Sequence, residues 1–195
     1  MTSHVAPKVA VVVGSLAKDS INRKFAEAVA KLARGRLDLQ IVEIKDLPLY
    51  SYDYDAAYPE PALRFKREIA AADAVLFVTP EYLRSIPAAL KNAIEWGSRP
   101  YGTSVWTGKP AAMIGTTPGA IGTAVAQAEL RSIANVLELA LITQPEVYFQ
   151  WKPDTLNGAG EIADEGARKV LNGWVDSFAA WIQRVRQPAI LAQAS

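Results

Sequence analysis

The sequence predicts an open α/β fold, in which helices cover both faces of a parallel sheet. Apolar, β-branched runs alternate along the chain with stretches of helical period, as is typical of parallel strands joined by crossover helices. The chain has 195 residues, the size of one ordinary domain, and 50% of them are hydrophobic. We therefore expect a single domain over residues 1–195, with residues 1–7 frayed and residues 187–195 forming a tail.

The individual elements follow from the local patterns. The predicted strands are residues 8–14, 39–44, 74–79, 110–116 and 139–143, in the sheet order 2-1-3-4-5. The predicted helices are residues 22–34, 62–72, 87–96, 122–138 and 162–186. Trp174 and Trp181 belong to the apolar stripe of the last helix and are expected to pack on the sheet. Residues 48–61 predict a long ordered loop, whose tyrosines either cover a ligand or face a partner subunit.

Composition excludes several classes of function. The 21 Lys and Arg residues almost balance the 20 Asp and Glu residues, so the net charge of +1 provides no field for a polyanion, and no nucleic-acid partner is expected. The absence of cysteine excludes disulfides, thiolate nucleophiles and Cys-ligated metals. The only histidine, His4, lies in the expected frayed leader, which disfavours an imidazole base and a His-rich metal site. No metal site is predicted.

The start of the chain and its apolar runs indicate a cytoplasmic protein. Residues 1–8, MTSHVAPK, lack the apolar core of a signal peptide. No uninterrupted apolar run reaches the roughly 18 residues that a membrane span requires. We therefore expect no membrane partner.

The first candidate loop, residues 14–22, joins the first predicted strand to the first predicted helix. Open α/β sheets bind ligands at the carboxyl ends of their strands, where this loop lies. Backbone N–H groups at a helix start favour an anion, and Ser15, Ser20 and Asn22 can donate further hydrogen bonds to a phosphate. Alternatively, Ser20 only caps the helix. The loop matches neither G-x-G-x-x-G nor G-x-x-x-x-G-K-[ST], which disfavours dinucleotide-binding Rossmann and P-loop NTPase interpretations.

A second loop, residues 79–87, follows the third predicted strand. It reads Thr-Pro-Glu-Tyr-Leu-Arg-Ser-Ile-Pro, and the next helix contains Leu-Lys-Asn-Ala-Ile-Glu-Trp. Together with the first loop, this motif resembles the flavin-binding signature of the NADPH-dependent FMN reductase family, which includes chromate and quinone reductases. The resemblance covers residues 8–145 and implies a flavodoxin-like, three-layer fold that binds FMN noncovalently.

The resemblance places the second loop beside the flavin. In the family, the turn corresponding to Pro80, Glu81, Tyr82 and Leu83 lies along the isoalloxazine ring, with Tyr82 as an aromatic wall. A prolyl turn favours this placement independently, because its pre-set backbone can offer fixed hydrogen bonds. For Glu81 the alternatives are a solvated loop carboxylate, an ion pair with Arg84, and a role at the flavin or at a subunit contact.

The third candidate loop, residues 116–122, again joins a strand to a helix. Its hydroxyls and glycines allow close approach to a flat ligand, although an ordinary turn is the alternative. In the similar family this segment flanks the flavin on the side away from the second loop. The FMN-binding residues that the resemblance implies are Ser15, Leu16, Ala17, Ser20, Ile21, Asn22, Pro80, Glu81, Tyr82, Leu83, Thr116, Thr117 and Gly119.

The sequence also departs from the family pattern. Family members often carry arginine at the position of Ala17, asparagine at that of Leu83, and a glycine pair at residues 88–89. Without the arginine, the FMN phosphate depends on hydroxyl, amide and backbone donors. Lys18 either compensates for the missing arginine or lies in solvent.

The expected function is an FMN-dependent oxidoreductase. NADPH or NADH donates a hydride to the flavin, and quinones, free flavins, azo compounds or chromate-like anions then take the electrons in a ping-pong reaction. No catalytic side chain is predicted, because the cofactor carries the chemistry. The alternatives are a flavodoxin-like electron carrier without direct nicotinamide use, and a flavin-free α/β module. A homodimer or homotetramer is expected, with residues 87–96 and 122–138, including Ala126 and Leu130, as contact surfaces.

Overall fold

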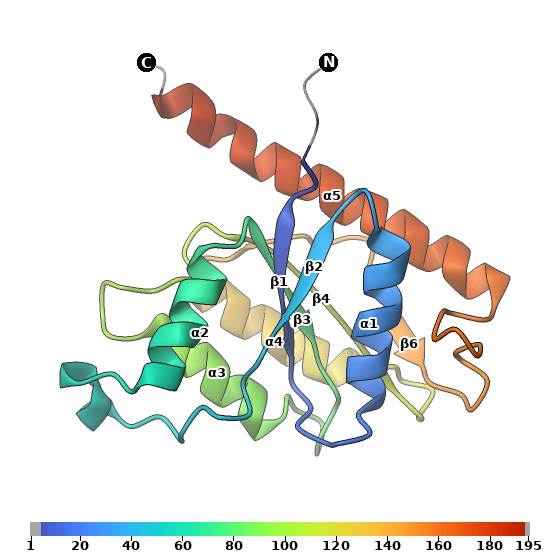
Figure 1. Cartoon of the computed structure of the whole chain (residues 1–195), viewed down its shortest axis with the longest axis horizontal. Helices are drawn as coiled ribbons and strands as arrows, with labels where there is room; N and C mark the ends of the chain where they lie inside the picture. Colours follow the sequence, from blue (N-terminus) through green and yellow to red (C-terminus); the bar gives the residue numbers. More distant parts are fainter. Residues whose placement is uncertain (1–4, 194–195) are drawn as a thin grey trace.

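The computed structural model describes residues 5–193 of the chain, with one sheet between two layers of helices (Figure 1). The strands are β1 (Lys8–Val13), β2 (Asp38–Val42), β3 (Ala74–Val78), β4 (Pro110–Thr117), β5 (Ala140–Leu141) and β6 (Tyr148–Gln150). The helices are α1 (Ile21–Ala33), α2 (Glu60–Ala70), α3 (Ala88–Ser98), α4 (Ala124–Val136) and α5 (Glu165–Gln193), with a 3₁₀ turn, η1, at Tyr52–Ala56. The predicted three-layer α/β class is confirmed.

The sheet is parallel and has the predicted order β2-β1-β3-β4-β5. The central strand β3 is buried along its whole length, so its residues are apolar on both faces. On one face, Phe77 of β3 joins Phe65 of α2, Leu90 of α3 and Leu130 of α4. On the other face, a second core combines β-strand residues with Phe25 and Val29 of α1 and with Trp174, Val175 and Phe178 of α5.

The fifth position of the sheet differs from the prediction. Instead of one strand over residues 139–143, β5 pairs with Pro110 and Ala111 at the start of β4. The strand β6 pairs with residues 115–117 at its end. Pro145 lies in the segment between them, and a proline has no N–H group with which to continue a ladder. The three residues of β6 are too few to show a strand period in the sequence.

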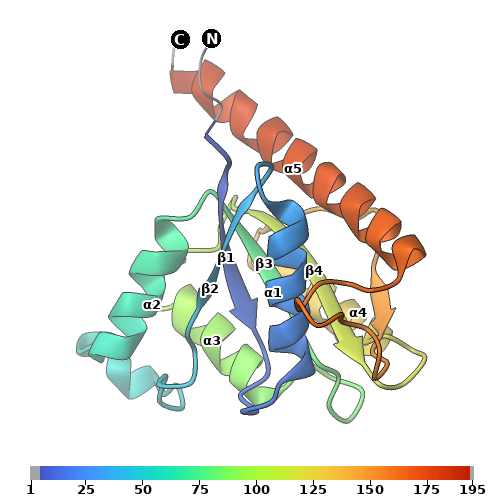
Figure 2. The same cartoon turned by 45° about the vertical axis from the view of Figure 1, so that its right-hand side comes forward.

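The last helix also differs from the prediction. Helix α5 continues to Gln193, through most of the segment that was expected to form a tail, and extends past the edge of the sheet (Figure 2). The apolar stripe marks only the part of a helix that packs on a core, so it did not reveal the true end. Trp174 is buried, and the indole N–H of Trp181 donates to the carbonyl of Ala140 at 2.7 Å, so both pack on the sheet as expected.

The tyrosine-rich loop of residues 48–61 is ordered and packs on α3. The rings of Tyr50, Tyr54 and Tyr58 surround Trp96 at centroid distances of 5.1, 5.5 and 5.0 Å. Burial raises the pKa of Tyr58 well above its ordinary value. These three rings therefore cover a core tryptophan, whereas Tyr52 remains exposed.

The described residues include neither a membrane-spanning helix nor a cluster of metal-ligating side chains. Among the helices within residues 5–193, none is both long and apolar enough to cross a membrane. The same part of the chain contains no group of three or more His, Asp or Glu side chains that could hold a metal. His4 lies outside the described residues.

Candidate active site

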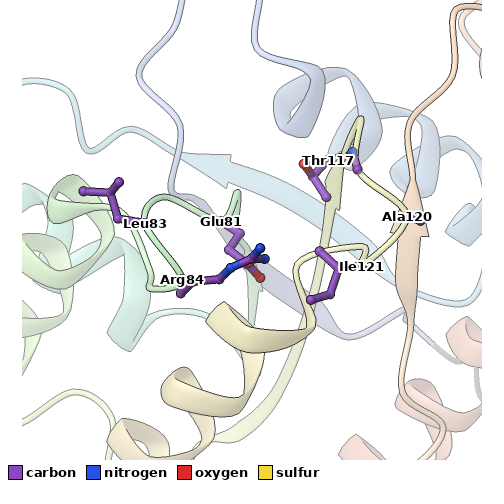
Figure 3. A pocket seen from close by; sticks show the side chains of 7 residues that line it. Glu81, Leu83, Arg84, Thr117, Ala120 and Ile121 are labelled. Carbon is purple, nitrogen blue, oxygen red and sulfur yellow. Dashed lines mark hydrogen bonds and ion pairs between the residues drawn. The ribbon is translucent and has the colours of Figure 1, made fainter.

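The three predicted loops meet at the carboxyl edge of the sheet, where they line two neighbouring cavities. The smaller, of about 240 Å³, receives residues from all three loops. The larger, of about 750 Å³, lies between the second and third loops (Figure 3). Glu81 and Thr117 line both cavities, so one ligand could extend from one into the other.

The structure brings together nearly all of the predicted site residues. Leu83 and Gly119 line the larger cavity, whereas Leu16 lines neither. Five lining residues were missed, although each belongs to one of the three predicted loops: Asp19, Arg84, Pro118, Ala120 and Ile121. The predicted residues that line the smaller cavity are Ser15, Ala17, Ser20, Ile21, Asn22, Pro80, Glu81, Tyr82, Thr116 and Thr117.

The first loop offers unpaired backbone donors at the start of α1. Within the described part of the chain, the N–H groups of residues 15–19 donate to no protein acceptor. Ser20 caps α1 by accepting a hydrogen bond from the N–H of Arg23 at 3.1 Å, as in the alternative interpretation of this serine. Its hydroxyl hydrogen remains free to donate. Free N–H groups followed by a helix start fit a phosphate.

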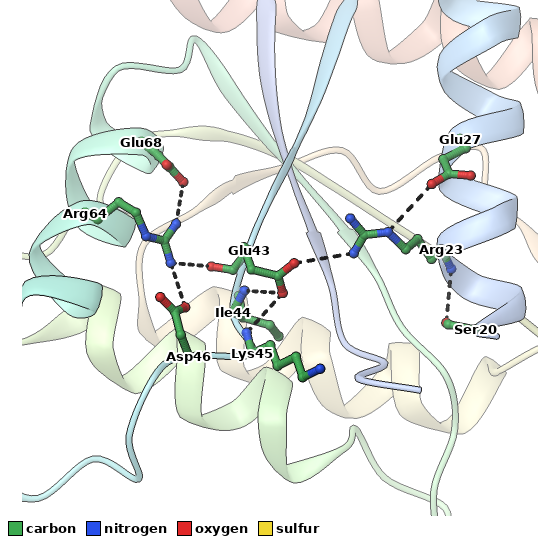
Figure 4. A network of polar contacts seen from close by, with 9 residues as sticks. All are labelled: Ser20, Arg23, Glu27, Glu43, Ile44, Lys45, Asp46, Arg64 and Glu68. Atoms are coloured by element: carbon green, nitrogen blue, oxygen red, sulfur yellow. Dashed lines mark hydrogen bonds and ion pairs between the residues drawn. The ribbon is translucent and has the colours of Figure 1, made fainter. Parts of the chain in front are cut away.

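Two basic side chains near this loop, Arg23 and Lys18, do not line the smaller cavity, and Asp19 is the charged side chain of the loop that does. Arg23 lies 3.6 Å from Glu27 and 3.6 Å from Glu43, so its charge is balanced on the β2 side of α1 (Figure 4). Lys18 is exposed and lines neither cavity. An anion in the smaller cavity would therefore be held by neutral hydroxyl and backbone donors.

The Asn22 side chain links the first loop to the third through two hydrogen bonds. The side chain is buried, its Nδ2 donates to the carbonyl of Thr116 at 2.9 Å, and its Oδ1 accepts from the N–H of Thr116 at 3.0 Å. The Thr116 hydroxyl donates to the carbonyl of Phe149 in β6 at 3.0 Å. Both side chains line the cavity, yet most of their hydrogen-bonding groups are used within the protein.

The second loop is a tight hairpin with an unusual backbone. Tyr82 and Ser85 exchange two backbone hydrogen bonds of 3.0 and 2.9 Å. Between them, Leu83 and Arg84 have positive φ angles of 53° and 64°. Such two-residue turns favour asparagine and glycine, and other residues there are strained. Leu83 is fully exposed at the tip.

Glu81 anchors this hairpin to α4. Its Oε2 accepts hydrogen bonds from the N–H groups of Val125 and Ala126 at 3.1 and 3.2 Å, and its Oε1 lies 2.9 Å from Nη1 of Arg84. The ion pair was one of the alternatives for Glu81. The capping of α4 was missed, because a carboxylate more than forty residues away from a helix leaves no local signal.

Two glycines allow the second and third loops to approach β4 and β6. A Cβ atom on Gly115 would lie 2.1 Å from the carbonyl oxygen of Thr79. A Cβ atom on Gly122, at a φ of +59°, would lie 2.3 Å from the backbone of Tyr148. The shape of the site therefore depends on close backbone contacts.

Comparison with known proteins identifies the family. Residues 7–153 match the family model described as NADPH-dependent FMN reductase. This chain belongs to that family. The match confirms the predicted family, FMN as the cofactor and a nicotinamide as the electron donor.

Several members of the FMN reductase family are close relatives over nearly their full length. A 2-hydroxy-1,4-benzoquinone reductase from a Burkholderia species is 50% identical over 179 residues, which are 92% of this chain and 98% of the relative. A quinone reductase from Pseudomonas putida is 49% identical over 176 residues, 90% of this chain and 94% of the relative. The chain is therefore an oxidoreductase of this family, and neither alternative class is supported.

Solved structures confirm the fold. The flavoenzyme FerB, an NAD(P)H:(acceptor) oxidoreductase from Paracoccus denitrificans, superposes with a TM-score of 0.89 at 47% identity and covers 92% of this chain and 98% of its own. A WrbA-like flavodoxin from Agrobacterium tumefaciens has a TM-score of 0.55 at 19% identity, over 93% of this chain and 99% of its own. The second likeness shows the flavodoxin-like fold alone.

Proposed function

We propose that this chain is an NAD(P)H-dependent quinone reductase. The observation that carries the proposal is that relatives at 50% and 49% identity, aligned over nearly all of both chains, are quinone reductases. The larger cavity supports it, because this hollow lies directly beside the smaller one and opens between two loops. Its apolar and polar lining suits a small aromatic acceptor.

The FMN phosphate is assigned to the first loop. The free N–H groups of residues 15–19 and the hydroxyls of Ser15 and Ser20 supply the donors, and the start of α1 favours the negative charge. The isoalloxazine ring is assigned to the space between the second and third loops, with Pro80, Tyr82 and Thr117 around it.

The bound FMN supplies the hydride and electron chemistry of the reaction. The protein fixes the loops around it through the Asn22 amide and the Glu81 carboxylate. The larger cavity admits the nicotinamide and the quinone in turn, which corresponds to a ping-pong order. No described side chain is assigned a proton-transfer step, so Tyr82→Ala should alter FMN retention or the acceptor range without abolishing turnover.

Other acceptors and the cellular setting belong to the same proposal. Free flavins, azo compounds and chromate-like anions are further acceptors of a reduced flavin that is open to solvent. A cytoplasmic location is proposed from the features of the sequence. A free-flavin reductase is the second candidate, and a relative from Pseudomonas aeruginosa at 35% identity is an NAD(P)H-dependent FMN reductase.

A homodimer or homotetramer is also proposed. Leu83 and Ile121 on the site loops and Val136 on α4 are exposed apolar side chains. Ala126 and Leu130, expected at a subunit contact, are instead buried against the sheet, so only the outer side of α4 is available. Light scattering at micromolar concentration should give a mass of two or four chains, and a mass of one 21.1 kDa chain would contradict the proposal.

The function is tested by spectroscopy followed by turnover. The purified protein, reconstituted with FMN, should show flavin absorbance that NADPH or NADH bleaches under anaerobic conditions. Adding 1,4-benzoquinone should restore the oxidised spectrum within the mixing time of a stopped-flow instrument. Bleaching without reoxidation by any quinone, but with rapid transfer to free FMN, would favour the free-flavin reductase.

A further inference from the structure

We infer that Arg84 makes the larger cavity selective for anionic acceptors, namely quinones that carry an ionised hydroxyl or carboxylate group. The inference rests on the proposed quinone reductase function and specifies the substrate class of that site. The larger cavity is lined by only two charged side chains, Glu81 and Arg84, and the other lining residues are Leu83, Thr117, Gly119, Ala120 and Ile121.

The two charges differ in how much they can influence a ligand. The Glu81 side chain is only 6% exposed, and three N–H donors satisfy its carboxylate. The positive end of the α4 dipole further offsets its charge. The Arg84 side chain is 70% exposed. Of the two charged groups, the Arg84 guanidinium is therefore the one that a ligand in the cavity can reach.

Arg84 also retains donors for a ligand. Only its Nη1 makes a hydrogen bond in the described structure, to Glu81 at 2.9 Å. Its Nε and Nη2 hydrogens donate to no acceptor within residues 5–193. Figure 3 shows the guanidinium group beside Glu81 and turned toward the segment that carries Ile121. A flat apolar ligand with one anionic substituent would meet aliphatic lining and a planar donor pair together.

The backbone of the hairpin gives independent support. Arg84 adopts a φ of 64°, a conformation that a glycine or asparagine would adopt at lower cost. The two Tyr82–Ser85 hydrogen bonds and the Glu81 ion pair hold it there. Strained backbone conformations cluster at ligand sites, where surrounding contacts maintain them. The strained turn at Arg84 is therefore consistent with a role for this arginine at the cavity.

The charge of the acceptor does not alter the chemistry of its reduction. A quinone takes up two electrons and two protons to become a hydroquinone. The hydride of NAD(P)H supplies two electrons and one proton, and water supplies the second proton. Arg84 holds the ionised substituent while the ring is reduced. A carboxylate keeps its charge in the hydroquinone, whereas an ionised hydroxyl becomes an ordinary phenol and takes a third proton from water. The guanidinium therefore acts as a specificity determinant that orients the acceptor.

The test separates the two half-reactions by stopped flow with the FMN-loaded enzyme. Arg84→Met should lower the second-order rate constant for reoxidation by ionised 2-hydroxy-1,4-naphthoquinone about fivefold, as expected for an exposed ion pair. Reoxidation by neutral 2-methyl-1,4-naphthoquinone should change by less than about twofold. The matched control is Arg67→Met on α2, where an exposed arginine also pairs with a glutamate, at 2.6 Å, and where no selectivity should be lost.

Two outcomes overturn the inference while leaving the function intact. Equal losses for the charged and neutral quinones would mean that Arg84 only supports the loop. A loss confined to the reductive half-reaction with NADPH would assign the arginine to the nicotinamide nucleotide.

If the wild type reduced no quinone, the proposed function would be wrong and the kinetic test could not be made. A binding measurement then tests the role of Arg84 separately. Benzoate, which the enzyme cannot reduce, should perturb the oxidised flavin spectrum more strongly than benzamide. Arg84→Met should remove that difference, whereas Arg84→Lys should retain part of it. Equal perturbation by benzoate and benzamide in the wild type would overturn the inference.

Discussion

Two of the site loops differ in how far their backbone N–H groups are paired within the protein. The first loop leaves five successive N–H groups, those of residues 15–19, without a protein acceptor in the described structure. The second loop is held by the two backbone hydrogen bonds between Tyr82 and Ser85 and by the Glu81 carboxylate. Glu129 holds it further by accepting a hydrogen bond from the N–H of Ile86 at 3.3 Å. The first loop therefore presents a run of free backbone donors to a ligand, whereas the N–H groups of Tyr82, Ser85 and Ile86 in the second loop are paired within the protein.

The difference indicates how the two loops contribute to binding. A loop with free donors gains its missing hydrogen bonds when an anion arrives, so its organisation is completed by the ligand. A hairpin with strained residues at its tip is organised in advance, and its geometry is maintained by the surrounding contacts. Substitutions in the first loop should therefore change affinity for FMN, and those around the second should change stability.

The largest expected effect on stability is at Gly115, where the start of the second loop packs closely against β4. Gly115→Ala would place a Cβ atom 2.1 Å from the Thr79 carbonyl oxygen and 2.5 Å from the Thr123 hydroxyl. The free energy of unfolding in urea should fall by about 3 kcal/mol, because backbone must move to relieve the clash. Gly173→Ala in α5 is the control, since its Cβ would meet nothing and should stabilise the helix by about 0.5–1 kcal/mol. Equal stability of the two variants would contradict the packing described.

The next effect is at Asn22, which joins the first loop to the third. Asn22→Ala leaves the buried N–H and carbonyl of Thr116 unpaired and should lower the free energy of unfolding by about 2–3 kcal/mol. FMN titration of the apoprotein should also show weaker binding, since the helix start is displaced. Asn135→Ala, at an exposed site on α4, should leave both quantities unchanged. If Asn22→Ala weakened FMN binding without loss of stability, the amide would contact the ligand directly.

The third effect is specific to the first loop. Ala17 lines the smaller cavity, and Ala17→Arg should tighten FMN about tenfold at low salt through charge-assisted hydrogen bonds to the phosphate. The gain should shrink as salt rises. Lys18→Ala should change the affinity by less than about twofold, because exposed ion pairs contribute little. Unchanged affinity for both variants at both salt concentrations would show that this loop does not hold the phosphate.

The smallest effect tests the strain in the hairpin. Leu83→Asn should raise the free energy of unfolding by about 0.5 kcal/mol, because asparagine adopts a φ of 53° more readily and the exposed leucine buries nothing. The same substitution at Leu49, which is 81% exposed without a positive φ, should have no stabilising effect. Destabilisation by Leu83→Asn would mean that the leucine makes a contact between subunits.

Local sequence patterns predicted the elements that depend mainly on residues near one another in the chain. The first four strand runs, the helix periods and the position of three loops at the carboxyl ends of strands follow from spacing and from apolar content. The Thr-Pro-Glu-Tyr motif added the family and the cofactor. The end of α5 and the division between β5 and β6 did not follow, because both depend on which neighbour a segment packs or pairs with.

The sequence by itself determined the fold class, the family and the loops that form the site. Only the tertiary structure decided what individual side chains do there: the Asn22 amide bonds to β4, the Glu81 carboxylate caps α4, and Arg84 keeps free donors at the larger cavity. The physical reason is that buried polar groups such as the Asn22 amide and the Glu81 carboxylate pair with the groups that the fold brings close to them, wherever those lie along the chain. For Asn22 that partner lies 94 residues away along the chain, and for Glu81 it lies 44 and 45 residues away.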